Sequence, residues 1–126
     1  MRPSRTLALV AVAVALPATA LATGSTYKGS VGGDKTQTLK FRVSDGKVRG
    51  FVAVIYATCY SGGMLTTVTL PPTRVKAGKF TTIYQPVKSS QTFVYVKGTI
   101  SGSKATGTIN ETGSCEFLKQ KWTAKR

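Results

Sequence analysis

Carboxylates, thiols and amines are the reactive side chains that this sequence offers. Its 126 residues include 4 Asp and Glu, 2 Cys, 18 Lys and Arg and no His. The absence of His excludes every mechanism that uses imidazole as a base, a proton shuttle or a metal ligand. An oxygen-ligand metal site or a paired-carboxylate hydrolase would need nearly all four carboxylates in one place. We therefore expect no catalytic residues, no metal and no cofactor.

Glu111 and Glu116 form the carboxylate pair that could come together, because they flank a turn at Gly113 and Ser114. A small hydrolase acting through these two residues, or through Asp45, is the enzymatic alternative. Asp45 lies in a hairpin turn, however, where Asp is favoured for backbone reasons. Loop carboxylates are by default solvated surface groups. The sequence therefore favours a protein that is not an enzyme.

The first 22 residues have the pattern of a secretory signal peptide. Arg2 and Arg5 precede a ten-residue apolar run at 7–16, and a small-x-small box ends at Ala22. This order is typical of an export signal, and the run is too short to span a bilayer. We predict cleavage after Ala22 and a secreted, extracellular protein without a transmembrane segment; the alternative is a buried N-terminal helix. Residues 23–126 would form a single β domain with 16 basic and 4 acidic side chains and a net charge of +12.

Cys59 and Cys115 are the only cysteines, and both follow the expected cleavage site. An even pair in an exported chain most simply forms one intramolecular disulfide. A reactive thiol would need a CxxC spacing or an activating His, and the chain has neither. We therefore expect a Cys59–Cys115 bridge.

The elements that must position these side chains are predicted to be strands. After residue 22 the chain is rich in Thr, Val, Tyr, Phe and Ile, and turn glycines recur at short intervals. Alternation is clearest at 36–44, and Asp45-Gly46 is a tight-hairpin signal before a second strand at 47–58. Short connections favour antiparallel pairing. We predict an all-β fold, an antiparallel β-sandwich or flattened β-barrel of about eight strands.

Strand alternation also predicts which side chains face the core. In the first hairpin arm, Gln37 shares a face with three apolar residues of 36–44. In the strand at 47–58, we expect Val48, Val52, Val54 and Tyr56 to face inward, with a second half that is apolar on both faces and a bulge or bend at Gly50. In the final strand at 115–124, we expect Leu118 to share the inner face with Trp122 and Ala124.

The C-terminal third carries a recognisable pattern: F-V-Y-V-K-G-T-I-S-G-S-K-A-T-G-T-I from residue 93, then N-E-T-G-S-C and K-W-T-A-K-R. It resembles a group of small exported β proteins of actinobacteria and related bacteria, which share G-x-I-x-G, a return A-x-G-x-I, a Cys and a terminal W-x-A. The segment K-x-x-F-x-V-S-D-G-K-V-x-x-F, present here in part as K-F-R-V-S-D-G-K-V-R-G-F, looks similar as well. The resemblance implies export and a β fold; the group has no assigned function to transfer.

The remaining signal is positive charge. Lys40 and Arg42 share an outer face, and Lys47 and Arg49 begin the strand that pairs with theirs, so the two arms could form one basic patch. A second cluster near the C-terminus contains Lys119, Lys121, Lys125 and Arg126. Such clusters attract polyanions, although outward lysines also keep strand faces soluble and protect sheet edges.

The leading hypothesis is an exported domain that adheres to an anionic cell-wall or extracellular polymer, or to a protein partner. The basic residues above would form its polyanion-binding sites, without specific recognition of nucleic acid. The alternatives are a cationic membrane-active or toxin-like protein, a calycin-like barrel that binds a small ligand, and an inhibitor that presents the loop at 86–91.

Overall fold

The computed structural model describes residues 23–126, so the expected signal peptide and its cleavage site lie outside the described residues. The described part contains nine strands and no helix. These strands are β1 (Thr23–Val31), β2 (Asp34–Ser44), β3 (Lys47–Cys59), β4 (Gly62–Thr69), β5 (Thr73–Arg74), β6 (Lys79–Tyr84), β7 (Phe93–Ser101), β8 (Lys104–Thr112) and β9 (Cys115–Lys125). The predicted all-β class is confirmed, with nine strands where about eight were expected.

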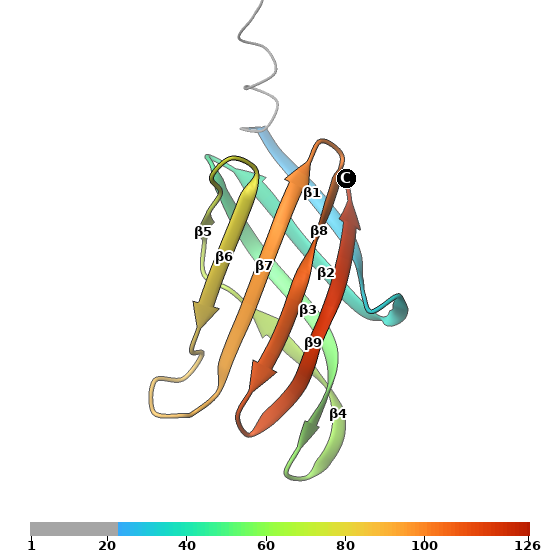
Figure 1. The fold of residues 1–126 in the computed structure, drawn as a ribbon, viewed down its shortest axis with the longest axis vertical. Helices are drawn as coiled ribbons and strands as arrows, with labels where there is room; N and C mark the ends of the chain where they lie inside the picture. Colours follow the sequence, from blue (N-terminus) through green and yellow to red (C-terminus); the bar gives the residue numbers. More distant parts are fainter. Residues whose placement is uncertain (1–22) are drawn as a thin grey trace, which may run out of the picture.

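The strands are antiparallel and form one sheet in the order β4-β3-β2-β1-β9-β8-β7-β6, with β5 paired to β3. A further pairing joins the end of β3 to the start of β9 and closes the ring β1-β2-β3-β9 into a small barrel. In Figure 1, β6 to β9 lie in front of β1, β2 and β3. Of the two predicted architectures, the fold is therefore the flattened barrel.

Tight turns join the hairpins as the sequence predicts. Asp45 and Gly46 have φ angles of 53° and 73°, the positive values that a type I′ turn requires. Ala77 and Gly78 have the same combination, at 51° and 76°, between Lys76 and Lys79. The first turn fixes the register of β2 and β3, and the second is closed by a single bridge between Lys76 and Lys79.

A bulge at Gly50 reverses the expected faces of β3. Arg42 pairs with Arg49 but Lys40 pairs with Val52, so β3 has one residue more than β2 in this interval. Gly50 has a φ of 61°, which suits the bulge. The bulge shifts the alternation by one residue, so Val48 is buried as predicted but the inward face predicted after Gly50 was wrong. The buried residues of the second half are Phe51, Ala53, Ile55 and Ala57, whereas Val52 and Val54 are half-buried and Tyr56 is exposed.

A second bulge corrects the expected faces of β9. Glu111 of β8 pairs with Phe117, but Ile109 pairs with Gln120, so two residues of β9 oppose Asn110. Phe117 is therefore buried, and Leu118 is 88% exposed instead of sharing the inner face of Trp122 and Ala124. The residues after the bulge keep the predicted alternation.

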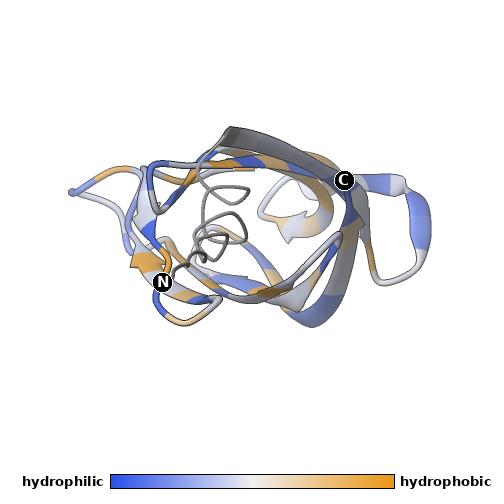
Figure 2. Ribbon diagram, turned by 90° about the horizontal axis from the view of Figure 1, so that it is seen from above, coloured by the Kyte–Doolittle hydropathy of each residue, from blue (hydrophilic) through white to orange (hydrophobic). Residues whose placement is uncertain are grey.

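Five aromatic side chains fill the centre of the barrel. Phe41 lies at the middle, with ring centroids 5.2 to 6.0 Å from those of Tyr27, Phe51, Phe80 and Trp122. They come from five different strands, so the cluster ties the layers together. Figure 2, viewed from above, shows hydrophobic and hydrophilic residues alternating along the strands around this interior.

Two glycines make room for Trp122. Gly98 pairs with Gly107, and Gly107 pairs with Trp122 across β7, β8 and β9. A Cβ atom at Gly98 or Gly107 would lie 2.8 or 2.5 Å from the indole, closer than packed atoms approach. The indole Nε1 donates a hydrogen bond to the carbonyl oxygen of Thr108 at 3.2 Å. The glycine and tryptophan pattern of the C-terminal third therefore has a packing cause.

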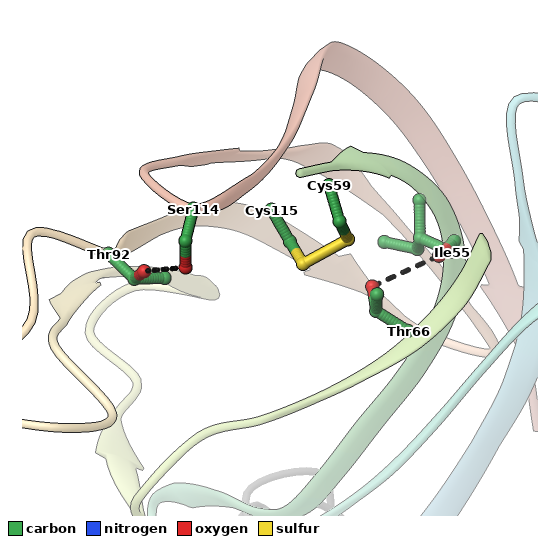
Figure 3. The surroundings of a disulfide bond; sticks show 6 residues. All are labelled: Ile55, Cys59, Thr66, Thr92, Ser114 and Cys115. Atoms are coloured by element: carbon green, nitrogen blue, oxygen red, sulfur yellow. Dashed lines mark hydrogen bonds between the residues drawn. A yellow bond between two sulfur atoms is a disulfide. The ribbon is translucent and has the colours of Figure 1, made fainter. Parts of the chain in front are cut away.

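The structure confirms the Cys59–Cys115 disulfide (Figure 3). The two residues are direct partners in the β3–β9 pairing, with Cα atoms 4.0 Å apart. Nearby, the Thr66 hydroxyl donates to the Ile55 carbonyl at 3.1 Å. The bridge lies where the ring of strands closes, so it fastens the barrel covalently at that point.

Candidate polyanion-binding surface

Four lysines lie side by side on four neighbouring strands. Lys40 of β2 pairs with Lys28 of β1, Lys28 pairs with Lys125 of β9, and Lys125 pairs with Lys104 of β8. All four are exposed on the outer face of the barrel. We call Lys28, Lys40, Lys104 and Lys125 the lysine row.

The spacing of a sheet brings these charges close together. Adjacent strands are about 4.8 Å apart, so the row spans about 14 Å. Like charges directly opposite each other on a sheet are destabilising. The lysine row contains three such pairs in succession, and this arrangement costs stability unless an anionic ligand compensates it.

A row of hydroxyl groups runs beside the lysine row. Thr38 pairs with Ser30, Ser30 with Thr123, Thr123 with Thr106, and Thr106 with Thr99, from β2 to β7. We call these five residues the hydroxyl row. Four are exposed and Ser30 is half-buried. All except Thr99, whose strand β7 has no member of the lysine row, lie two residues from a row lysine along the same strand, about 7 Å away on the same face.

Lys79 and Lys97 extend the basic surface onto β6 and β7. Lys79 pairs with Thr99 and so ends the hydroxyl row, and Lys97 pairs with Thr108. Both lysines line an open hollow of about 290 Å³, together with Thr99, Thr106 and other residues of β6, β7 and β8. A second hollow, of about 420 Å³, is lined at the other end of the rows by Lys28, Gly29, Thr38, Leu39, Lys40 and Val52.

Gly29 allows the two halves of the rows to meet. It pairs with Ala124 where β1 joins β9, and a Cβ atom there would overlap the carbonyl oxygen of Thr123. Lys28 and Ser30, which flank this glycine, therefore lie directly opposite Lys125 and Thr123. A glycine is the residue that lets the strands approach this closely.

The first predicted basic patch lies beside the lysine row. Arg42 and Arg49 are direct cross-strand partners, two residues along β2 from Lys40. The Nε of Arg49 is buried and has no hydrogen-bond partner among the described residues. Lys47 pairs with Arg74 of β5 and with Ser44. The hairpin arms thus place Arg42 and Arg49 together, while Lys47 lies at the turn end.

The second predicted cluster is divided by the β9 bulge. Lys121 pairs with Thr108 and lies on the outer face two residues from Thr123, so it adjoins the hydroxyl row. Lys119 lies in the bulge and lines a different hollow with Glu111 and Glu116. Lys121 is therefore continuous with the main basic surface and Lys119 is not, while Lys125 of the same cluster belongs to the lysine row.

The four acidic residues lie away from the lysine row. Asp34 begins β2, accepts hydrogen bonds from the Thr36 amide at 2.9 Å and hydroxyl at 2.7 Å, and has its pKa lowered by them. Asp45 follows the other end of β2. Glu111 and Glu116 lie at the ends of β8 and β9 opposite to Lys104 and Lys125. No acidic side chain is therefore a cross-strand partner of a row lysine in the pairings of residues 23–126.

Glu111 and Glu116 do share one hollow, of about 370 Å³, near the disulfide end. Glu111 is only 8% exposed, its Oε1 has no partner among the described residues, and burial raises the pKa of its carboxyl. Glu116 is exposed. The other side chains around the hollow are those of Thr58, Asn110, Thr112, Phe117, Leu118 and Lys119.

Exposed apolar side chains gather elsewhere, on the β3–β4 hairpin. Tyr56, Tyr60, Met64 and Leu65 are all about half exposed or more. Figure 1 shows this hairpin projecting at the lower end of the barrel. Gly62–Thr69 contains no charged residue, in contrast to the basic outer face.

Residues 23–126 contain no group of three or more side chains suited to hold a metal ion. In the same part of the chain, no helix has the length and apolar character needed to cross a bilayer. No family model, no curated protein and no solved structure matches the chain. The arrangement of its own side chains is therefore the basis for a functional assignment.

Sequence reasoning missed Lys28 and Lys104 of the lysine row, and it missed the hydroxyl row as a whole. Alternation along each strand indicates that both lysines face outward, but each is a lone lysine in its own strand. The signal lies in the pairing of β1 with β9 and of β9 with β8, which brings them into line with Lys40 and Lys125.

Proposed function

We propose that this protein is an exported, non-enzymatic β domain that binds an anionic polymer through the outer face of its barrel. The observation that carries the proposal is the lysine row, in which Lys28, Lys40, Lys104 and Lys125 are successive cross-strand partners. Three adjacent like-charge pairs are unfavourable in the free protein. Binding of a polyanion would relieve this repulsion. Lysines that only keep the surface soluble would not need to be aligned in this way.

The surroundings of the row support the same function. The positive surface continues on both sides of the lysine row, at Arg42 and at Lys121, Lys79 and Lys97. The hydroxyl donors of the hydroxyl row lie between these cations. With a net charge of +12 on residues 23–126, the positive potential would also speed the approach of a polyanion. A disulfide is compatible with an oxidising location outside the cell, where anionic cell-wall polymers are found.

The test is a binding titration of residues 23–126 with a fluorescent dextran sulfate and with neutral dextran of the same size. We expect binding to dextran sulfate alone, weakening steeply as salt is raised, because counterions are released when lysines neutralise a polyanion. Binding of both dextrans, or binding that is independent of salt, would contradict the proposal.

Contact with a protein partner or a membrane is the second candidate, and the apolar β3–β4 hairpin is what favours it. An uncharged turn and strand that expose Tyr60, Met64 and Leu65 are unusual on such a basic protein. The discriminating measurement is leakage from anionic vesicles, compared between the wild type and the Tyr60→Ser variant. Leakage that the substitution abolishes would favour the membrane candidate, whereas intact vesicles would remove it.

The calycin-like alternative requires an open apolar cavity inside the barrel. The aromatic cluster around Phe41 occupies the centre of the barrel and gives this alternative no support. The outer surface is accordingly the better place to look for a ligand.

A further inference from the structure

We infer that the ligand is a linear phosphate polymer that lies across the strands, with the lysine row and the hydroxyl row contacting the same chain. This inference rests on the proposed function and specifies the ligand class and its direction. Both rows run perpendicular to the strands, from β2 through β1 and β9 to β8. A chain laid along them would meet lysine on one side and hydroxyl donors on the other.

The two hollows mark the ends of this track. The hollow at β1 and β2 is lined by Lys28 and Lys40 of the lysine row and by Thr38 of the hydroxyl row. The hollow at β6 to β8 contains Thr99 and Thr106 of the hydroxyl row, with Lys79 and Lys97. Between them, Lys125 and Thr123 lie two residues apart on β9 and continue both rows. Cationic and hydroxyl side chains thus line the track along its whole length.

The side-chain types favour phosphate over carboxylate. The row contains four lysines and no arginine, so its cations act as point charges and not as the planar fork that pairs with an anion in a bidentate way. Ammonium groups act as point charges on phosphate, and Ser and Thr hydroxyls are common donors to phosphate oxygens. A phosphate in a chain exposes more than one oxygen, so it can accept from a lysine and a hydroxyl together.

The rows favour recognition of the phosphate backbone alone. Their nine members are Lys, Ser and Thr, so neither row offers an aromatic ring on which a base could stack. Inorganic polyphosphate, polyol phosphate and single-stranded nucleic acid share the required chemistry. We expect a nucleic acid to bind through its phosphates with no dependence on base.

The length of the row sets the length of the bound segment. Four lysines spanning about 14 Å engage about four phosphates. Short chains such as diphosphate leave some lysines unpaired, so affinity should rise steeply up to about four or five phosphates and slowly afterwards. The slope of log K against log salt should be about −3 for such a flexible chain.

The experiment compares polyphosphate chains of graded length, poly-glutamate of matched charge, and oligo-dT with oligo-dA, each titrated into residues 23–126. A hydroxyl variant combines Ser30→Ala, Thr106→Val and Thr123→Val. Its matched control combines Thr58→Val, Thr67→Val and Thr112→Val, which lie outside the rows. Circular dichroism melting shows that each variant is folded.

We expect polyphosphate to bind at least tenfold more tightly than poly-glutamate, and oligo-dT and oligo-dA to bind equally. The hydroxyl variant should lose about tenfold in affinity for polyphosphate, as three modest hydrogen bonds predict, and the control variant should not. Equal affinity for polyphosphate and poly-glutamate, or a hydroxyl variant that binds like the control, would overturn this inference while leaving polyanion binding intact. If none of the polymers binds, both the inference and the proposed function fail.

Discussion

Lys28 of β1 lies directly opposite Lys125 of β9, in the pairing that joins the first strand of the domain to the last. Each of these lysines has a second lysine, Lys40 or Lys104, on its other side. The barrel thus places four positive charges in line by joining strands that are far apart in the sequence. This relationship links the fold to the proposed polyanion binding.

The lysine row should cost the free protein stability. A variant in which Lys28, Lys40, Lys104 and Lys125 are all changed to Gln removes three like-charge pairs. We expect its thermal midpoint to rise by a few degrees at low salt, because the repulsion is gone. The gain should shrink at high salt, where exposed charges are screened. Differential scanning calorimetry at several salt concentrations makes the measurement.

The control for this prediction changes four lysines that lie elsewhere, namely Lys35, Lys76, Lys88 and Lys119, to Gln. It alters the net charge equally and removes one like-charge pair, that of Lys76 with Lys79, against three in the lysine row. If the control gains as much stability as the row variant, then overall charge and not the alignment of the row is responsible.

The disulfide should account for a large part of the stability. Cys59 and Cys115 close a loop of about 57 residues, for which the chain-entropy model gives about 4 kcal/mol. The double variant Cys59→Ala, Cys115→Ala should lower the free energy of unfolding in urea by about that amount. Because the bridge joins β3 to β9 at the closure of the ring, amide exchange should accelerate first at those strand ends. Unchanged stability would show that the β3–β9 pairing needs no bridge.

Gly107→Ala should destabilise the barrel by overpacking. The added methyl group would meet the Trp122 indole and the carbonyl oxygen of Lys97. We expect a loss of about 2 kcal/mol or more in urea unfolding, with a shift in Trp122 fluorescence. Gly102→Ala is a useful comparison, since a Cβ there meets nothing within 4 Å although its φ is positive. A fluorescence shift for Gly102→Ala equal to that for Gly107→Ala would argue against a specific contact with the indole.

Local sequence signals predicted the parts of the fold that depend on neighbouring residues. Alternation identified β2, and Asp45-Gly46 identified a turn with two positive φ angles. Gln37 occupies the buried face predicted for it and is 6% exposed, and its amide donates to the Val31 carbonyl at 3.0 Å. Such features follow from side-chain period and turn chemistry, which a short segment contains in full.

The features that sequence reasoning missed depend on contacts between distant strands. The bulge at Gly50 was expected, but its effect on every later side chain of β3 was not, because a one-residue shift exchanges the two faces. The bulge at Leu118 contains no glycine, so no residue type in the sequence indicated it. The lysine row could not be predicted from the sequence, because no local sequence signal indicates that β1 lies between β2 and β9.

Glu111 should make stability depend on pH. Burial raises the pKa of its carboxyl, so the folded state favours the protonated form. The stability associated with this group is complete below the pKa of the unfolded chain and is lost as pH rises through the higher folded pKa. Glu111→Gln should therefore gain stability over the wild type as pH rises from acidic to neutral. Urea unfolding at several pH values measures the difference, with Glu116→Gln at the exposed neighbour as the control.

Parallel curves of stability against pH for Glu111→Gln and the wild type would contradict the prediction. They would mean that burial of the ionised Glu111 carboxyl costs no stability, although its Oε1 has no hydrogen-bond partner among the described residues. A difference that grows toward acidic pH would contradict the sign of the shift.

The most direct test of the account is the affinity of the lysine-row variant for polyphosphate, measured beside the wild type and the control variant with the same net charge. If the row is the binding surface, changing Lys28, Lys40, Lys104 and Lys125 to Gln should weaken binding by at least a hundredfold and lower the salt slope by about 3. The control at Lys35, Lys76, Lys88 and Lys119 should lose only the small part that net charge contributes. Equal losses in the two variants would contradict the assignment of the site to the lysine row.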